Sequence, residues 1–300
     1  LGPVATVASA VGERVTRARA GYRSVDAPDG WAHTPTEALI VTTEDGVALH
    51  VEIDAPDTTS LSRRHLAGRT PTVVLVHGFA LTMQSWVLQR RSLKHSGFRV
   101  VNYDQRGHGR SGMPDLERCT IDQLGRDLAA VLDATCTSGP VVLVGHSMGG
   151  MTIMSYAGQH RDVVRDRVLA VALVSTSPGG DEMTEIGLGT TAGRVVGSFG
   201  PTVLTRLSRH AGPIGALRKM GKGVQDAAVQ RWAFDSPVST DLVQLVGDMI
   251  FGTSFDVMAA FLPDMDALDI SGELTALVGV ETLVINGDGD LITPPSHSEE

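Results

Sequence analysis

The feature that most constrains this 300-residue chain is a series of short, continuously apolar segments, each ending at glycine or a polar residue. Helical patterns over 82–95, 120–135 and 149–160 separate the first four of them. Strands that are apolar on both faces and alternate with helices are typical of a parallel sheet covered on both sides. We therefore predict an α/β fold with five buried strands: TVVLVHG (72–78), FRVVNYD (98–104), VVLVGH (141–146), VLAVALVST (168–176) and ETLVING (281–287).

The remaining segments divide the chain around this sheet. ALIVTT and VALHVEI lie on either side of Glu44-Asp45-Gly46 and predict a strand hairpin within 37–55. Residues 179–270 contain helical patches and no strong strand, which predicts an inserted helical lid over the carboxyl edge of the sheet. We expect an N-terminal extension (1–35), a core (36–178 and 271–300) and a lid (179–270).

The N-terminal extension allows two interpretations. Val4, Val7, Val11 and Val15 recur at helical spacing, and several arginines follow them. The segment is either a helix on the surface or the end of a signal or anchor segment, which would associate the protein with a membrane. The compartment stays undetermined, although no apolar run reaches the ~18–20 residues that span a bilayer.

Composition narrows the classes of partner. A net charge of −9 argues against nucleic acid, whose phosphates require a basic surface. The chain has no HExxH motif, no clustered cysteines and no phosphate-binding loop, so we expect neither a metal nor an organic cofactor. The spacing of Cys119 and Cys136 is neither metal-like nor redox-like, which favours two free thiols over one disulfide.

The apolar segment 141–146 leads directly into Ser147, which lies between Gly145-His146 and Met148-Gly149. A serine at which a buried strand turns at once into a helix adopts a strained backbone conformation, and the residues two positions away must be small. The turn places the hydroxyl at a helix N-terminus, where N–H groups favour negative charge. We predict that Ser147 is a nucleophile, against the alternative of a structural serine in a tight turn.

The loop at 77–79, His-Gly-Phe, follows a neighbouring strand. An oxyanion hole needs two N–H donors aimed at one point, and the amides of Phe79 and Met148 are the candidates. Gly78 would let the backbone approach closely. We expect the His77 imidazole to hydrogen-bond to loop backbone and to take no part in the chemistry.

Another loop, DQRGHGRS (104–111), follows the strand at 98–104. Arg106 and His108 are residue types that occur in active sites. Two glycines and alternating hydrogen-bond donors favour a scaffolding role for both side chains instead.

A carboxylate at a strand end can orient a histidine and stabilise its imidazolium form. In GDGD (287–290), Asp290 is the candidate for this role, and Asp288 is expected to cap the turn. Asp181, after the preceding strand, is a weaker alternative.

These motifs together resemble the α/β-hydrolase superfamily, and more narrowly its lid-bearing esterase, lipase and peroxidase-like members. The resemblance extends from about residue 37 to residue 300 and rests on HGF (77–79), DQRGHGRS (104–111), GHSMGG (145–150) and GDGDLITPP (287–295). It implies that Ser147 is the nucleophile and Asp290 the acid of a catalytic triad. It also implies oxyanion amides and the loops that support them, at Phe79, Met148, His77, Gly78, Gly145, His146 and Gly149.

The family pattern further requires a histidine some tens of residues after the acid. His297 is the only histidine that follows Asp290, but it is seven residues away, within the next expected helix. We therefore expect the catalytic histidine beyond Glu300, in a longer protein of which these residues form a part.

A serine nucleophile predicts attack on a carbonyl, an acyl-enzyme and its release by water. We expect a hydrolase of small-molecule carboxylic esters, and lid residues such as Phe251 and Phe261 suggest apolar acyl groups unless they only pack the lid onto the core. The alternatives are C–C bond, amide or thioester hydrolysis, cofactor-free perhydrolysis, and ligand binding without catalysis. Epoxide hydrolases and haloalkane dehalogenases of this fold use aspartate as nucleophile, so Ser147 argues against them.

Overall fold

A computed structural model describes residues 30–57, 70–179, 222–290 and 292–299. Most of the predicted N-terminal extension lies outside these ranges. So does the first half of the predicted lid, including Asp181.

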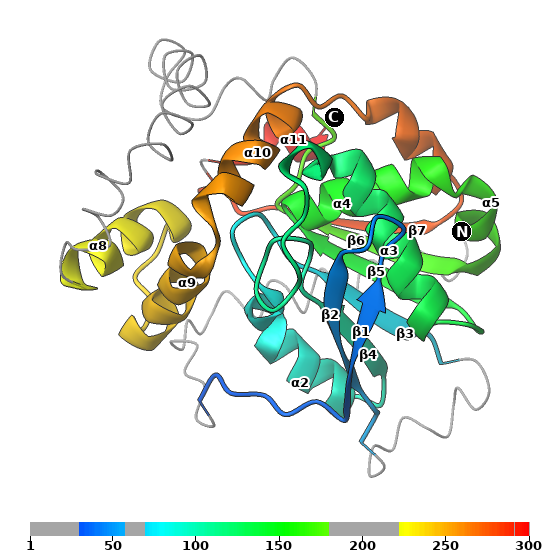
Figure 1. Ribbon diagram of the computed structural model, residues 1–300, viewed down its shortest axis with the longest axis horizontal. Helices are drawn as coiled ribbons and strands as arrows, with labels where there is room; N and C mark the ends of the chain where they lie inside the picture. Colours follow the sequence, from blue (N-terminus) through cyan, green and yellow to red (C-terminus); the bar gives the residue numbers. More distant parts are fainter. Residues whose placement is uncertain (1–29, 58–69, 180–221, 291, 300) are drawn as a thin grey trace, which may run out of the picture.

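A seven-stranded sheet, in the order β1-β2-β4-β3-β5-β6-β7, forms the centre of the molecule (Figure 1). β1 and β2 form the predicted antiparallel hairpin, β2 is antiparallel to β4, and the other pairs are parallel. The prediction of a mostly parallel sheet is thus confirmed. The strands are β1 (Glu37–Thr42), β2 (Ala48–Asp54), β3 (Thr72–Val76), β4 (Arg99–Tyr103), β5 (Val141–His146), β6 (Val168–Val174) and β7 (Glu281–Ile285).

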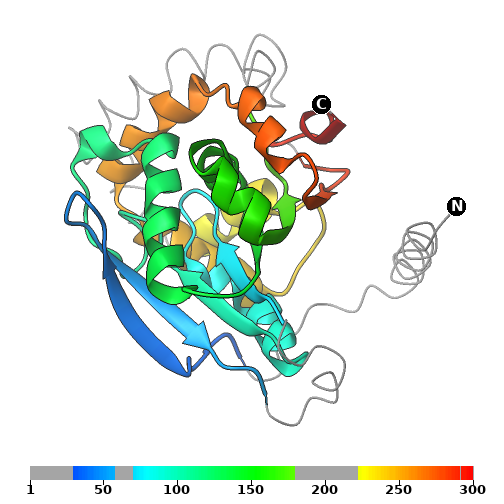
Figure 2. The same ribbon diagram turned by 90° about the vertical axis from the view of Figure 1, so that its right-hand side faces the viewer.

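Helices cover both faces of the sheet, with α3 and α4 side by side on one face and α2 on the other (Figures 1 and 2). α3 begins as predicted, because the Thr120 hydroxyl accepts a hydrogen bond from the Gln123 N–H at 3.1 Å. The helices of the core and its C-terminal part are η2 (Met83–Trp86), α2 (Val87–His95), η3 (Leu116–Arg118), α3 (Ile121–Thr135), α4 (Met148–Gln159), α5 (Arg161–Arg167), η5 (Ser271–Leu277) and α11 (Ser296–Glu299).

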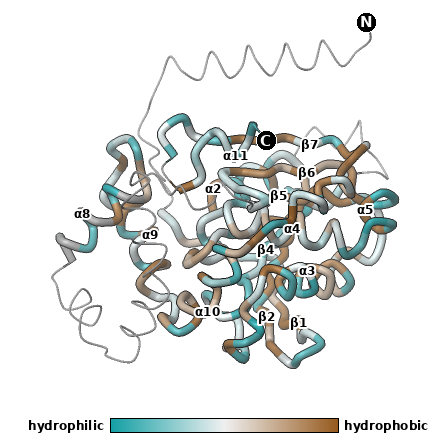
Figure 3. The backbone as a smooth tube through the Cα atoms, turned by 90° about the horizontal axis from the view of Figure 1, so that it is seen from above, coloured by the Kyte–Doolittle hydropathy of each residue, from teal (hydrophilic) through white to brown (hydrophobic). Residues whose placement is uncertain are grey.

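Each central strand contributes to two separate hydrophobic clusters. Val74 and Val76 of β3 pack with α3 and α4, whereas Val73 and Leu75 pack with Trp86 before α2. Successive side chains of a strand point to opposite faces, so a strand between two layers of helices must be apolar at every position. Figure 3 shows these central strands as hydrophobic stretches of the backbone. Cys119 and Cys136 are both buried and free, as expected.

β7 differs from its prediction as a buried strand. It pairs with β6 on one side and ends the sheet on the other, and all five of its residues are exposed. Leu283, Val284 and Ile285 are 52%, 46% and 46% exposed. Its apolar sequence identified the strand, but burial depends on neighbours that an edge strand lacks.

The described part of the predicted lid consists of α8 (Lys222–Ala233), α9 (Thr240–Gly252) and α10 (Phe255–Asp266). α8 and α9 lie to one side of the sheet, and α10 runs from the end of α9 along the core (Figure 1). Val257 and Phe261 of α10 are completely buried in the main cluster. Among the described helices, no single one is long and apolar enough to cross a membrane, and only α9 and α10 together, bent by 88°, meet that test.

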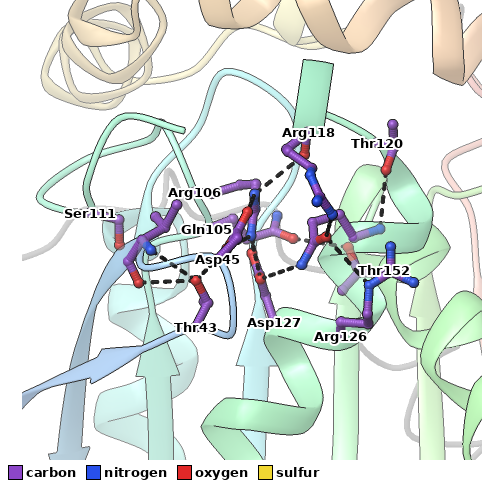
Figure 4. Close-up of polar contacts among 12 residues, drawn as sticks. Thr43, Asp45, Gln105, Arg106, Ser111, Arg118, Thr120, Arg126, Asp127 and Thr152 are labelled. Carbon is purple, nitrogen blue, oxygen red and sulfur yellow. Dashed lines mark hydrogen bonds and ion pairs between the residues drawn. The ribbon is translucent and has the colours of Figure 1, made fainter. Parts of the chain in front are cut away.

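Arg106, after β4, joins three segments that are far apart in sequence (Figure 4). Its guanidinium donates two hydrogen bonds to Asp127 of α3, at 2.6 and 2.7 Å, and two to Asp45 of the β1–β2 turn, at 2.8 and 3.0 Å. The Arg106 side chain is fully buried. Arg106 holds the pKa of Asp45 well below its usual range, so that carboxylate stays ionised. This geometry supports the predicted scaffolding role of the Arg106 side chain.

We expect Arg106→Met to lower the free energy of unfolding by about 3–5 kcal/mol, because it leaves Asp127 buried and unpaired. Arg126→Met is the matched control, since Arg126 pairs with the exposed Asp122 and Glu44. That substitution should cost less than about 1 kcal/mol. Urea unfolding of both variants measures the difference, and similar small effects would contradict the assigned role of Arg106.

Candidate active site

Ser147 forms the turn between β5 and α4. Its φ of 51° and ψ of −120° lie outside the regions that residues with a side chain favour. A Cβ at Gly149 would overlap the Val76 carbonyl oxygen, and one at Gly145 would overlap the Gly149 carbonyl. The strand and helix therefore approach so closely that both positions require glycine, which is the geometry the sequence pattern predicts.

We expect Gly149→Ala to lower the free energy of unfolding by about 1–3 kcal/mol, because the new methyl group collides with backbone that cannot move aside. Gly252→Ala is the control, since a Cβ at this last residue of α9 has no atom within 4 Å. The control should be neutral or stabilise by up to about 1 kcal/mol. Thermal unfolding distinguishes the two, and equal melting temperatures would refute the close-contact argument.

The two candidate oxyanion donors lie at the ends of neighbouring parallel strands. Phe79 follows β3, and the completely buried Met148 is the first residue of α4. No hydrogen bond within the described part of the chain uses either backbone N–H. Both N–H groups are therefore available to a ligand oxygen, and the burial of Met148 makes an unpaired N–H there unusual.

His77 is completely buried, and both of its ring nitrogens are occupied by backbone. Nδ1 lies 2.8 Å from the Gly78 carbonyl oxygen, to which it donates, because Nε2 accepts from the Gln105 N–H at 2.9 Å. Gln105 in turn donates to the His77 carbonyl at 2.7 Å and accepts from the Thr152 hydroxyl at 2.9 Å. The expectation that His77 binds loop backbone is thus confirmed. Sequence analysis missed Gln105, whose one signal was its position after β4.

Both ring nitrogens of His108 also hydrogen-bond to backbone groups. Its Nε2 accepts from the Ala80 N–H at 3.2 Å, and its Nδ1 lies 2.9 Å from the Arg106 carbonyl. Ala80 has a positive φ of 57°, which an L-residue rarely adopts. His108 therefore holds a strained residue directly after Phe79.

Burial lowers the pKa of both histidines from the usual 6.5, to about 4 for His77 and about 3 for His108. Both are neutral in the folded protein and take up a proton on unfolding below about pH 6.5. Their contribution to stability is complete above that pH and is lost as the pH falls from 6.5 toward 4. Between about pH 7.5 and 5.5, carboxyl groups with ordinary pKa values stay ionised, so the buried histidines His77, His108 and His146 contribute to the pH dependence of stability.

Over this interval we expect the free energy of unfolding to fall, with a slope approaching about 1.4 kcal/mol per pH unit for each histidine. Urea unfolding across the interval measures the slope. His108→Gln should reduce the slope, because it removes one of the buried histidines whose pKa is lowered. An unchanged slope in His108→Gln would refute the assigned protonation.

The acid candidate Asp290 lies in the turn after β7. One of its carboxylate oxygens accepts the N–H groups of Ile292 and Thr293, both at 2.9 Å, and the other accepts the Thr293 hydroxyl at 3.0 Å. Asp290 therefore caps the residues that follow it, and the expected capping by Asp288 stays a prediction. The negative charge of Asp290 also reaches His146, whose pKa burial lowers.

None of the described histidines hydrogen-bonds to the Ser147 hydroxyl or to the Asp290 carboxylate. His297 lies in α11, is 6% exposed, and its Nδ1 has no partner among the described residues. Within the same ranges, no three His, Cys, Asp or Glu side chains gather as a metal site. The structure thus brings together the serine turn and the two amides, and the base stays a prediction.

The sequence profile described as alpha/beta hydrolase fold matches residues 71–300. The chain belongs to the α/β-hydrolase family. This membership accounts for the serine turn, the sheet order and the position of the acid candidate after β7.

Individual relatives carry out different reactions. A non-heme haloperoxidase from Rhodococcus erythropolis is 27% identical over 253 residues, which cover 83% of this chain and 85% of the relative. An sn-1-specific diacylglycerol lipase from Mus musculus is 27% identical over 230 residues, covering 76% and 69%. Among solved structures, a thermophilic esterase from Thermogutta terrifontis is 25% identical, with a TM-score of 0.61, and the match covers 88% of this chain and 85% of that chain.

Proposed function

We propose that this α/β hydrolase cleaves small-molecule carboxylic esters through an acyl-enzyme on Ser147. The observation that carries the proposal is the strained serine turn beside the N–H groups of Phe79 and Met148, which have no partner among the described residues. This combination suits a reaction in which negative charge develops on a carbonyl oxygen next to the attacking hydroxyl.

In the proposed mechanism, the Ser147 hydroxyl attacks the ester carbonyl while a histidine accepts its proton. The carbonyl oxygen becomes an oxyanion and accepts hydrogen bonds from the Phe79 and Met148 amides. Each such donor contributes about 2.7–4 kcal/mol to lowering the barrier. The alcohol leaves with the proton from the histidine, and water then releases the acid from Ser147. Asp290 is proposed to orient the histidine, which we expect beyond the described residues.

The acyl group is proposed to be apolar. Met258 and Phe261 of α10 are buried, and Phe79 and Phe261 each lie against the ring of His108. The complete burial of Phe261 supports the alternative considered above for this residue, namely packing of the helix onto the core. An acyl site would therefore use less buried side chains of the same region.

Perhydrolysis is a second candidate, favoured by the similarity to the Rhodococcus erythropolis haloperoxidase over 83% of this chain. Here hydrogen peroxide would replace water in attacking the acyl-enzyme, so that the product is a peracid. Both reactions share the first step on Ser147 and differ only in the second nucleophile.

We expect the natural-length protein to hydrolyse p-nitrophenyl esters from acetyl to decanoyl, and Ser147→Ala in that protein to reduce kcat/KM by at least about 10³-fold. Asp290→Asn should reduce it by about 10²–10⁴-fold, because an asparagine cannot stabilise the imidazolium. Asp288→Asn is the control for that loop and should stay within about threefold. Oxidation of added bromide in the presence of peroxide detects the peracid.

Full activity of Ser147→Ala would exclude the proposed nucleophile. Wild-type protein that hydrolyses no ester of any length would exclude ester hydrolysis and favour another reaction or ligand binding. Equal losses in the Asp290 and Asp288 variants would exclude the specific role of Asp290.

A further inference from the structure

The end of α9 contacts the loop that follows Phe79. Thr253, which is 2% exposed, is the C-cap residue of this helix. Its hydroxyl lies 3.2 Å from the Ala80 carbonyl oxygen and 3.1 Å from the Met249 carbonyl oxygen, so its single proton is shared between them. Within the described ranges, no other group donates to the Ala80 carbonyl. A residue of the predicted lid thus satisfies a buried backbone group of the core.

Ala80 is held from both sides. Its carbonyl faces Thr253, and its N–H donates to His108. A positive φ in a residue other than glycine persists only where its surroundings enforce it. Since Ala80 directly follows Phe79, these two hydrogen bonds also restrict the direction of the Phe79 backbone.

The partner of the Ala80 N–H is itself covered by α10. The Phe261 ring lies 5.9 Å from the His108 ring, centroid to centroid. The Val257 side chain occupies the space beside Gly107, where a Cβ would come within 2.6 Å of it. Gly107 has a φ of 72° and needs glycine for that reason as well. Both supports of Ala80 therefore depend on the packing of α9 and α10.

We propose that Thr253 is a positioning residue that holds the Phe79 N–H in the orientation required for oxyanion binding, acting through Ala80. The inference rests on the proposed ester hydrolysis. The inference extends the proposed function, because it makes the oxyanion hole dependent on the helices inserted between β6 and β7. Thr253 does not touch the substrate in this scheme, and its effect falls on the transition state rather than on substrate binding.

The test compares Thr253→Val, which removes the hydroxyl at nearly constant shape, with Thr253→Ser, which keeps it. On p-nitrophenyl esters, the valine variant should lose about tenfold in kcat with KM within about twofold, since misplacing one oxyanion donor lowers the transition-state affinity alone. The serine variant should retain kcat within about threefold.

Thr135→Val is the matched control. Thr135 is a buried threonine at the end of α3, and its hydroxyl donates to the Val131 carbonyl four residues back at 2.6 Å, remote from Ala80. Its kcat should equal that of the wild type. An equal loss in Thr135→Val, or full kcat in Thr253→Val, would overturn the proposal.

Amide hydrogen exchange provides a readout that needs no activity. Thr253→Val should raise the exchange rate of the Ala80 amide by about tenfold, and Thr253→Ser and Thr135→Val should leave it unchanged. Unchanged exchange in Thr253→Val overturns the positioning role whatever the activity. If the wild type hydrolyses no ester, the proposed function fails, while faster exchange in Thr253→Val still shows that Thr253 holds the loop.

Discussion

The close approach of the first turn of α4 to β3 is the constraint on which the rest of the site depends. Because the Gly149 Cα lies against the Val76 carbonyl, β5 must turn at Ser147 without an intervening loop. The same turn puts the start of α4 next to the end of β3, and hence Met148 near the loop that contains Phe79. Gly150 extends this packing, since a Cβ there would come within 2.6 Å of Thr176, whose hydroxyl donates to the Ser147 carbonyl.

Buried polar groups then hold the surrounding loops in one arrangement. His77 and His108 each use one ring nitrogen as donor and the other as acceptor, which a neutral imidazole can do and an imidazolium cannot. Burial keeps both imidazoles neutral, because a charge is costly in the low dielectric of the protein interior. The neutral form in turn maintains these hydrogen bonds. Arg106, unlike these two histidines, is buried in its charged form, because the carboxylates of Asp45 and Asp127 pair with it.

Local features were predictable from the sequence, and features that depend on distant neighbours were not. The strand ends, the Thr120 cap and the glycines around Ser147 follow from patterns within a few residues. The exposure of β7 depends on its place at the end of the sheet, which its apolar sequence does not encode. Likewise, the Thr253–Ala80 contact joins residues 173 apart in the chain, and the sequence around Thr253 carries no sign of it. The hydrogen bonds from Ile292 and Thr293 to Asp290 likewise depend on how the turn after β7 folds, and the sequence of that turn does not show them.

Among the described residues, the outer edge of β7 is open to pairing with another strand. Along its outer side no described strand accepts or donates the ladder hydrogen bonds, and three large apolar side chains stand half exposed beside them. An uncovered apolar edge is a template on which another extended chain can add. An extended segment that adds beside β7 would therefore pair with the outer backbone groups of this strand and at the same time cover Leu283, Val284 and Ile285.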